Sequence, residues 1–121
     1  MNILIIDDDK LAINTLMHCL KTLGHEVFVA NDGEEAIQKI SSGSFDLVIS
    51  DIMMPGISGL SLVSVLRSVH LCHIPIIMMS SLNNTQLLEA AFEAGANDFI
   101  AKPFAVEELV NKLKLYDKKA K

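Results

Sequence analysis

The chain has 121 residues, half of them hydrophobic, which suits one compact domain with a core and excludes an intrinsically disordered chain. Its formal charge of −5 disfavours direct nucleic-acid binding, and no apolar run approaches the roughly 20 residues of a membrane-spanning helix. The N-terminus lacks the pattern of a secretory signal and the two cysteines need no disulfide, so we expect a cytoplasmic protein without a membrane partner.

Apolar runs alternate with stretches of helical period along the whole chain. The runs that predict strands are Ile3–Ile6, Val27–Ala30, Phe45–Ile49, Ile74–Met79 and Phe99–Ala101. The stretches that predict helices are Lys10–Leu23, Glu34–Ile40, Leu60–Val69, Thr85–Ala94 and Val106–Lys118. Three of the apolar runs are nearly continuous in Ile, Leu, Val and Met, which is typical of strands covered on both faces. The alternation therefore predicts βαβ units and an α/β fold with a parallel sheet.

Residues near the expected helix ends agree with this order. Asp9 is expected to cap the first helix, because it stands where the helical stretch begins. In that helix an apolar face is predicted to contain Leu11, Thr15, Cys19 and Leu23, with Leu16 and Leu20 beside it. Further turn and cap residues are Asn31, Asp32, Gly33, Ser58 and Gly59, with Gly24 and Gly95 as C-terminal glycines. Ala105 leaves the fifth helix without a capping side chain.

Polar side chains follow four of the predicted strands. Asp7 and Asp8 come after the first strand, Asp51 after the third, Ser80 after the fourth and Lys102 after the fifth. In a doubly wound sheet these positions meet at the carboxyl edge. Carboxylates gathered there would repel one another unless a cation lay between them, and oxygen ligands with few protein contacts suit Mg²⁺. Carboxylates, a metal ion, an ammonium group and a hydroxyl together indicate a site that holds a phosphoryl group.

The segments that carry these residues resemble a known family. "IIDDD", "DIMMPGISG", "IPIIMMSS" and "AGANDFIAKPF" are similar to the four site segments of receiver domains of two-component response regulators. The resemblance runs from Asn2 to Leu115. It implies a single receiver domain over residues 1–121, with a core at about 2–115 and a short basic C-terminal tail. It also implies a doubly wound, five-stranded parallel sheet of order 2-1-3-4-5 with five helices, as in flavodoxin-like and chemotaxis-receiver folds.

The resemblance assigns the site residues their roles. Asp51 would accept a phosphoryl group from a phosphohistidine on a histidine kinase or phosphotransfer protein. Asp8 and Asp51 would bind Mg²⁺ directly, Asp7 would act through water, and Met53 would contribute its backbone carbonyl. Lys102 and the metal would offset the charge of the phosphoryl oxygens. Such a domain is no enzyme in the ordinary sense, because it catalyses only its own phosphorylation and slow dephosphorylation.

The same resemblance implies a switch. Ser80 would turn its hydroxyl toward the new phosphoryl group and the ring of Phe99 would move inward, although Phe99 also fits a plain core position. Lys102-Pro103 resembles the cis peptide of the family. The face built from the fourth helix, fifth strand and fifth helix would signal to an output domain or a downstream protein. The resemblance leaves open a phosphorylation-dependent homodimer, and also whether the chain stands alone or belongs to a longer regulator.

Two apolar residues stand where rapid hydrolysis of the phosphorylated form would need polar side chains. Met53 and Leu82 each stand two places after a key residue, Asp51 and Ser80, where family side chains flank the path of the hydrolytic water. Neither can orient water by hydrogen bonding. We therefore expect a long-lived phosphorylated form.

Other classes of function fit less well. An aspartyl phosphohydrolase with a D-x-D nucleophile after the first strand is disfavoured, because Asp7 and Asp8 are adjacent. A flavodoxin-like cofactor carrier needs a phosphate-cradling loop where this chain has "DDDK". A purely structural domain would not need the full set of site residues. A metal site at His70, Cys72 and His73 stays a weak alternative.

Overall fold

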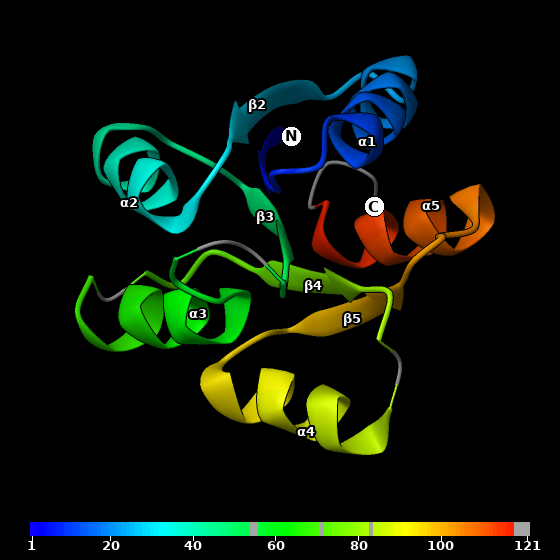
Figure 1. Ribbon diagram of the computed structural model, residues 1–121. Coiled ribbons are helices and arrows are strands. Elements are labelled where there is room, and N and C mark those ends of the chain that lie inside the picture. The colour runs from blue at the N-terminus through cyan, green and yellow to red at the C-terminus, as the bar shows by residue number, and fades with distance from the viewer. Residues whose placement is uncertain (54–55, 71, 83, 118–121) are drawn as a thin grey trace.

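A computed structural model describes residues 1–53, 56–70, 72–82 and 84–117, and within these ranges five strands alternate with five helices (Figure 1). The strands are β1 (Asn2–Ile6), β2 (Glu26–Ala30), β3 (Leu47–Asp51), β4 (Ile76–Ser80) and β5 (Asp98–Ala101). The helices are α1 (Lys10–Thr22), α2 (Gly33–Ser42), α3 (Gly59–Ser68), α4 (Thr85–Ala94) and α5 (Val106–Tyr116). All neighbouring strands are parallel, in the order β2-β1-β3-β4-β5, which confirms the predicted fold. In this described part, no helix is both long and apolar enough to cross a bilayer.

Alternate residues of the strands face two separate apolar layers. One layer packs under α1 and α5 and receives the strand residues Ile3, Ile5, Leu47, Ile49, Ile77, Met79 and Ile100. The other packs under α2, α3 and α4 and receives Leu4, Ile6, Val48, Ile76, Met78 and Phe99. Figure 1 shows the two groups of helices on opposite faces of the sheet. Because both faces are covered, the central strands are apolar at almost every position.

Two strands extend further at their carboxyl ends than their apolar runs predict. β3 ends at Asp51 rather than Ile49, and β4 ends at Ser80 rather than Met79. Parallel pairing continues past the last apolar residue, since Asp51 pairs with Met79 in the β3–β4 register. The predicted starts at Phe45 and Ile74 were wrong, because these residues pack against the core before their strands begin. Asp51 and Ser80 are therefore held by the sheet itself.

The buried side of α1 differs from the predicted face. Ile13, Leu16 and Leu20 are its buried residues, at helical spacings of three and four. Leu11 is 75% exposed, and Leu23, which follows the helix as its C-cap, is 43% exposed. The apolar pattern identified the helix correctly but assigned its inner side incorrectly.

Most of the predicted cap residues are confirmed, although several helices begin or end one or two residues away from their predicted bounds. The N-cap side chains of α1 to α4 accept hydrogen bonds from the first turn, and they are Asp9, Asp32, Ser58 and Asn84. Gly24 after α1 and Gly95 after α4 have φ angles of 92° and 119°, which favour glycine. Ala105 provides no side-chain cap to α5. The fifth helix ends at Tyr116, with Asp117 as its C-cap, so the predicted end at Lys118 was wrong. The basic tail after Asp117 lies outside the described residues.

One side chain, Arg67 near the end of α3, joins two connecting segments at the amino edge of the sheet. Its guanidinium donates to the carbonyls of Gly95, Cys72 and Ile74 at 3.1, 2.8 and 2.7 Å. It also donates to the Asn97 side chain at 2.8 Å. Arg67 therefore fixes the turn that follows α4 to the segment between α3 and β4.

Replacing Arg67 by Ala should lower the free energy of unfolding by about 2–4 kcal/mol, because it orphans several partly buried carbonyls at once. Arg67→Lys should recover only a small part of this loss, since an ammonium group cannot reproduce the planar fork. Urea denaturation measures the change. As a control, Lys21→Ala at an exposed position of α1 should stay within about 0.5 kcal/mol of the wild type. Equal stability of Arg67→Ala and wild type would contradict the role of this clamp.

Candidate functional site

The carboxyl edge of the sheet gathers the polar residues that the sequence singles out. Asp7 directly follows β1, Asp51 and Ser80 are the last residues of β3 and β4, and Lys102 directly follows β5. Backbone hydrogen bonds continue the strand pairing at this edge: Asp7 N–H donates to Ala30 at 3.1 Å, and Lys102 N–H donates to Ser80 at 2.8 Å. Parallel pairing thus brings together residues that lie up to 95 positions apart.

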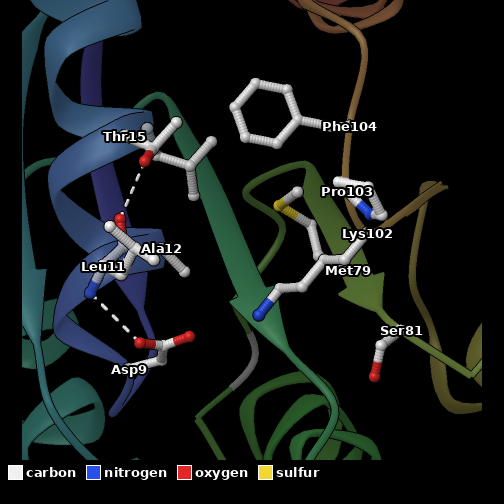
Figure 2. Close-up of a pocket in the computed structure, with 10 residues that line it drawn as sticks. Asp9, Leu11, Ala12, Thr15, Met79, Ser81, Lys102, Pro103 and Phe104 are labelled. Atoms are coloured by element: carbon white, nitrogen blue, oxygen red, sulfur yellow. Dashed lines mark hydrogen bonds between the residues drawn. The ribbon is translucent and has the colours of Figure 1, made fainter.

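Lys102 lies between two buried carboxylates. Its Nζ is 2.9 Å from Asp7 Oδ2 and 3.4 Å from Asp51 Oδ1. Asp7 is 2% exposed, and its other oxygen accepts from the N–H of Asp9 at 3.0 Å. Figure 2 shows the Lys102 side chain extended across the sheet edge, with its amine toward the ends of the central strands. The ammonium group is therefore held between two acids by ion pairs.

The electrostatic environment shifts both partners of this pair. Burial raises the pKa of Asp51, and the neighbouring charge of Asp7 adds to that rise, while Lys102 and the N–H of Met53 oppose it. Burial alone would lower the pKa of Lys102, but the hydrogen bond to Asp7 and the charges of Asp51 and Asp7 raise it overall. Lys102 therefore remains a cation at neutral pH.

Three carboxylates at this edge fit a hard divalent cation. Oxygens of Asp7, Asp8 and Asp51 all lie within 4.8 Å of one another, and within the described ranges no other group of three acidic, histidine or cysteine side chains does so. Lys102 balances one of the three negative charges, which leaves an excess that a metal ion can neutralise. Asp8 is exposed, so one ligand faces solvent. The residues present therefore fit the cation that the sequence predicts.

The His70, Cys72 and His73 alternative is not supported. These three side chains do not form a convergent ligand group in the described structure. Cys72 is 8% exposed, and its carbonyl accepts a hydrogen bond from Arg67. Cys72 therefore has a structural role as a partner of Arg67.

Ser80 and Phe99 lie on neighbouring strands behind the acids. Ser80 is fully buried, and its Oγ accepts a hydrogen bond from the N–H of Leu82 at 3.0 Å. Phe99 is 9% exposed and packs into the apolar layer under α3 and α4. Its core position is thus established, and its part in a switch stays a prediction.

The loop after β3 contributes backbone groups to the site. The N–H of Met53 lies close enough to the Asp51 carboxylate to oppose the rise of its pKa, whereas the Met53 side chain is 59% exposed. Leu82, in the segment after β4, is 51% exposed. Met54 and Pro55 of the predicted acceptor segment lie outside the described residues. The Lys102–Pro103 peptide bond is cis, as the resemblance implied.

A hollow beside the acids was not found from the sequence. It measures about 320 Å³ and lies between α1 and the segment after β5 (Figure 2). Its lining includes Leu11, Thr15, Ser81 and Phe104 next to Lys102. The sequence could not indicate it, because its shape depends on how side chains of α1 pack beside the segments that follow β4 and β5.

Comparisons with known proteins give a consistent result. The family model described as "Response regulator receiver domain" matches residues 3–114. Response regulator MprA of Mycobacterium avium is 36% identical, over 94% of this chain and 50% of MprA. Transcriptional regulatory protein CrdR of Helicobacter pylori is 32% identical, over 94% of this chain and 54% of CrdR. The chain thus spans about half the length of these curated relatives.

Solved structures agree with the sequence matches. A putative response regulator from Chloroflexus aurantiacus superposes with a TM-score of 0.90 at 40% identity, over 95% of each chain. The chemotaxis protein CheY4 of Vibrio cholerae gives a TM-score of 0.89 at 30% identity, over 96% of this chain and 98% of CheY4.

Proposed function

Because this chain belongs to the receiver domain family of two-component response regulators, we propose that Asp51 accepts a phosphoryl group from a phosphohistidine. The donor would be a histidine kinase or a phosphotransfer protein. One observation carries the proposal: Asp51 lies at the end of a central strand, beside the partly buried Lys102 and within 4.8 Å of two further carboxylates. The proposed unit is a single receiver domain over residues 1–121.

The chemistry follows from the groups present. A carboxylate oxygen of Asp51 forms a bond to phosphorus while the bond from phosphorus to the donor imidazole breaks, and the released imidazole takes a proton from solvent. Lys102 holds one positive charge next to the reacting oxygen, where negative charge gathers during transfer. Mg²⁺, bound directly by Asp8, Asp51 and the Met53 carbonyl and through water by Asp7, would neutralise further phosphoryl charge. The domain then acts on itself and turns over no separate substrate.

The proposed switch begins at Ser80. A phosphoryl group brings close to two negative charges to Asp51 and so attracts the hydroxyl of Ser80, which at present accepts from the Leu82 N–H. Turning that hydroxyl would free the segment before α4 and give Phe99 room to move inward. The face of α4, β5 and α5 would then signal to an output domain or downstream protein, or form a phosphorylation-dependent homodimer.

Incubation with acetyl phosphate tests this function. With Mg²⁺, intact-protein mass spectrometry should detect one added phosphoryl group, and an excess of EDTA should suppress it. A chain that gains no phosphoryl group from acetyl phosphate or from a phosphohistidine donor would contradict the proposal. Steady turnover of small phosphate esters would instead favour a phosphohydrolase.

We expect phosphorylated Asp51 to persist well beyond seconds once the donor is removed. The exposed side chains of Met53 and Leu82 are apolar, so they cannot orient or deprotonate an attacking water. Leu82→Glu should shorten the lifetime of the phosphorylated form about tenfold to a hundredfold, because a carboxylate there can act as a general base toward the attacking water. This factor is no larger than the smallest rate gains that general-base catalysis usually gives. The decay of the phosphorylated mass with Mg²⁺ present measures both values.

Val69→Glu is the matched control for this lifetime, because Val69 is equally apolar and 69% exposed but lies at the other edge of the sheet. It should decay like the wild type. Loss of the phosphoryl group from the wild type within seconds would show that the apolar pair does not protect it.

A further inference from the structure

The loop between β3 and α3 is fastened at its base. The N–H of Gly59 donates to the Ile52 carbonyl at 2.8 Å, which brings the start of α3 back to the end of β3. A Cβ at Gly59 would lie 2.3 Å from the Asp51 carbonyl oxygen, so only glycine allows this approach. The loop that carries the Met53 peptide thus starts and ends next to the acceptor.

A second contact holds the same loop from α2. Gly33 is the first residue of α2 and is buried, and Ile57 of the loop lies directly against it. A Cβ at Gly33 would lie 2.0 Å from the Cγ2 methyl of Ile57, well below any real contact. The φ angle of Gly33 is not in the left-handed region, so its backbone would accept any residue. Space for Ile57 is therefore the structural reason for glycine here.

We propose that Gly33 is a positioning residue for the phosphoryl-accepting site. By leaving room for the Cγ2 methyl of Ile57, it lets the start of α2 hold the β3–α3 loop, which keeps the Met53 peptide at Asp51. The inference rests on the proposed function of Asp51. It extends the site to a helix that contributes no ligand and no reacting group.

The structure leaves space next to Ile57 into which its side chain can move. A hollow of about 380 Å³ adjoins the contact and is lined by Asp32, Glu34, Ile37 and Gly56 together with Gly33 and Ile57. An added Cβ at Gly33 should therefore push Ile57 and its loop outward instead of unfolding the domain. Since alanine also favours helix over glycine, the helix itself does not oppose the change. The effect should appear at the site more than in stability.

Gly33→Ala tests the proposal. It should weaken Mg²⁺ binding about tenfold, which is the smaller of the losses usually seen when a residue that supports the metal ligands is changed. Phosphorylation by acetyl phosphate should slow by a similar factor. Without metal, the amide NMR signals of Met53 and Gly56 should already shift. Ile57→Ala removes the same contact from the other side and should weaken Mg²⁺ binding in the same way, which keeps the test valid if Gly33→Ala fails to fold.

A rescue separates positioning from general damage. Leucine at position 57 has no methyl on Cβ, so the double variant Gly33→Ala/Ile57→Leu should regain most of the Mg²⁺ affinity. Unchanged Mg²⁺ affinity and unchanged loop signals in folded Gly33→Ala would overturn the proposal. A double variant that binds Mg²⁺ as weakly as Gly33→Ala alone would also overturn it. Because Mg²⁺ affinity is measured without phosphorylation, a wild type that binds Mg²⁺ but takes no phosphoryl group would sink only the proposed function.

Discussion

Asp51→Asn should abolish phosphorylation of this protein while leaving its fold intact. The amide has nearly the same shape as the carboxylate and can still accept the hydrogen bond from Lys102, but it has no anionic oxygen to attack phosphorus. Intact-protein mass after incubation with acetyl phosphate and Mg²⁺ should therefore stay at the unmodified value. The matched control is Asp9→Asn, which keeps a capping side chain on α1 next to the site and should still be phosphorylated.

The same substitution should change the pH dependence of stability without metal. Burial raises the pKa of Asp51 in the folded state above its ordinary value of 3.8. The folded protein then binds more protons than the unfolded chain between the two values, so this group lowers the free energy of unfolding as pH rises through that window. Asp51→Asn should lose this decline and be the more stable protein at neutral pH, as urea denaturation at several pH values would measure. A wild type that is more stable than Asp51→Asn at neutral pH without Mg²⁺ would contradict the argument.

Lys102→Met should affect transfer and metal binding in opposite directions. Without the ammonium group, charge on the transferring phosphoryl oxygens loses a preorganised partner, so phosphorylation should slow by about 10²–10³-fold. Mg²⁺ should bind more tightly, because the variant removes a positive charge that lies 3.4 Å from Asp51. Phosphorylation rates at saturating Mg²⁺ and calorimetric titration of the metal measure the two effects.

Lys112→Met is the control for Lys102→Met. Lys112 also forms an ion pair with a partly buried acid, Asp98, but this pair joins α5 to β5 away from the carboxyl cluster. Its replacement should leave both phosphorylation and Mg²⁺ affinity near the wild-type values. Transfer by Lys102→Met at the wild-type rate would show that the lysine does not stabilise the transferring group.

Several features of this protein could be predicted from sequence because their causes are local. Alternation of apolar runs with helical stretches depends on near neighbours, and it predicted every strand and helix that the structure describes. Caps such as Asp9 and Asp32 act within three residues of their own position. The residues that gather at the site were also found, because parallel strands must end at one edge. Local pattern combined with the rules of parallel sheets was sufficient here.

Other features depended on contacts between distant segments. The sequence indicated that Lys102 faces acids, but only the structure decided that its amine lies nearer Asp7 than Asp51. The inner side of α1 was predicted incorrectly, because helical period marks apolar positions without showing which of them the sheet covers. The ends of β3 and β4 also needed their neighbours, since pairing continues past the last apolar residue.

The amino-acid sequence by itself thus determined the order of elements, most of their caps and the identity of the acidic, hydroxyl and lysine groups at the carboxyl edge. Tertiary structure alone decided the four hydrogen bonds of Arg67, the hollow beside Lys102 and the contact between Ile57 and Gly33. The physical reason is the distance along the chain over which each kind of interaction acts. Propensity and capping act within a few residues of the chain, whereas each of these contacts joins segments whose proximity exists only after the sheet and its helices have packed.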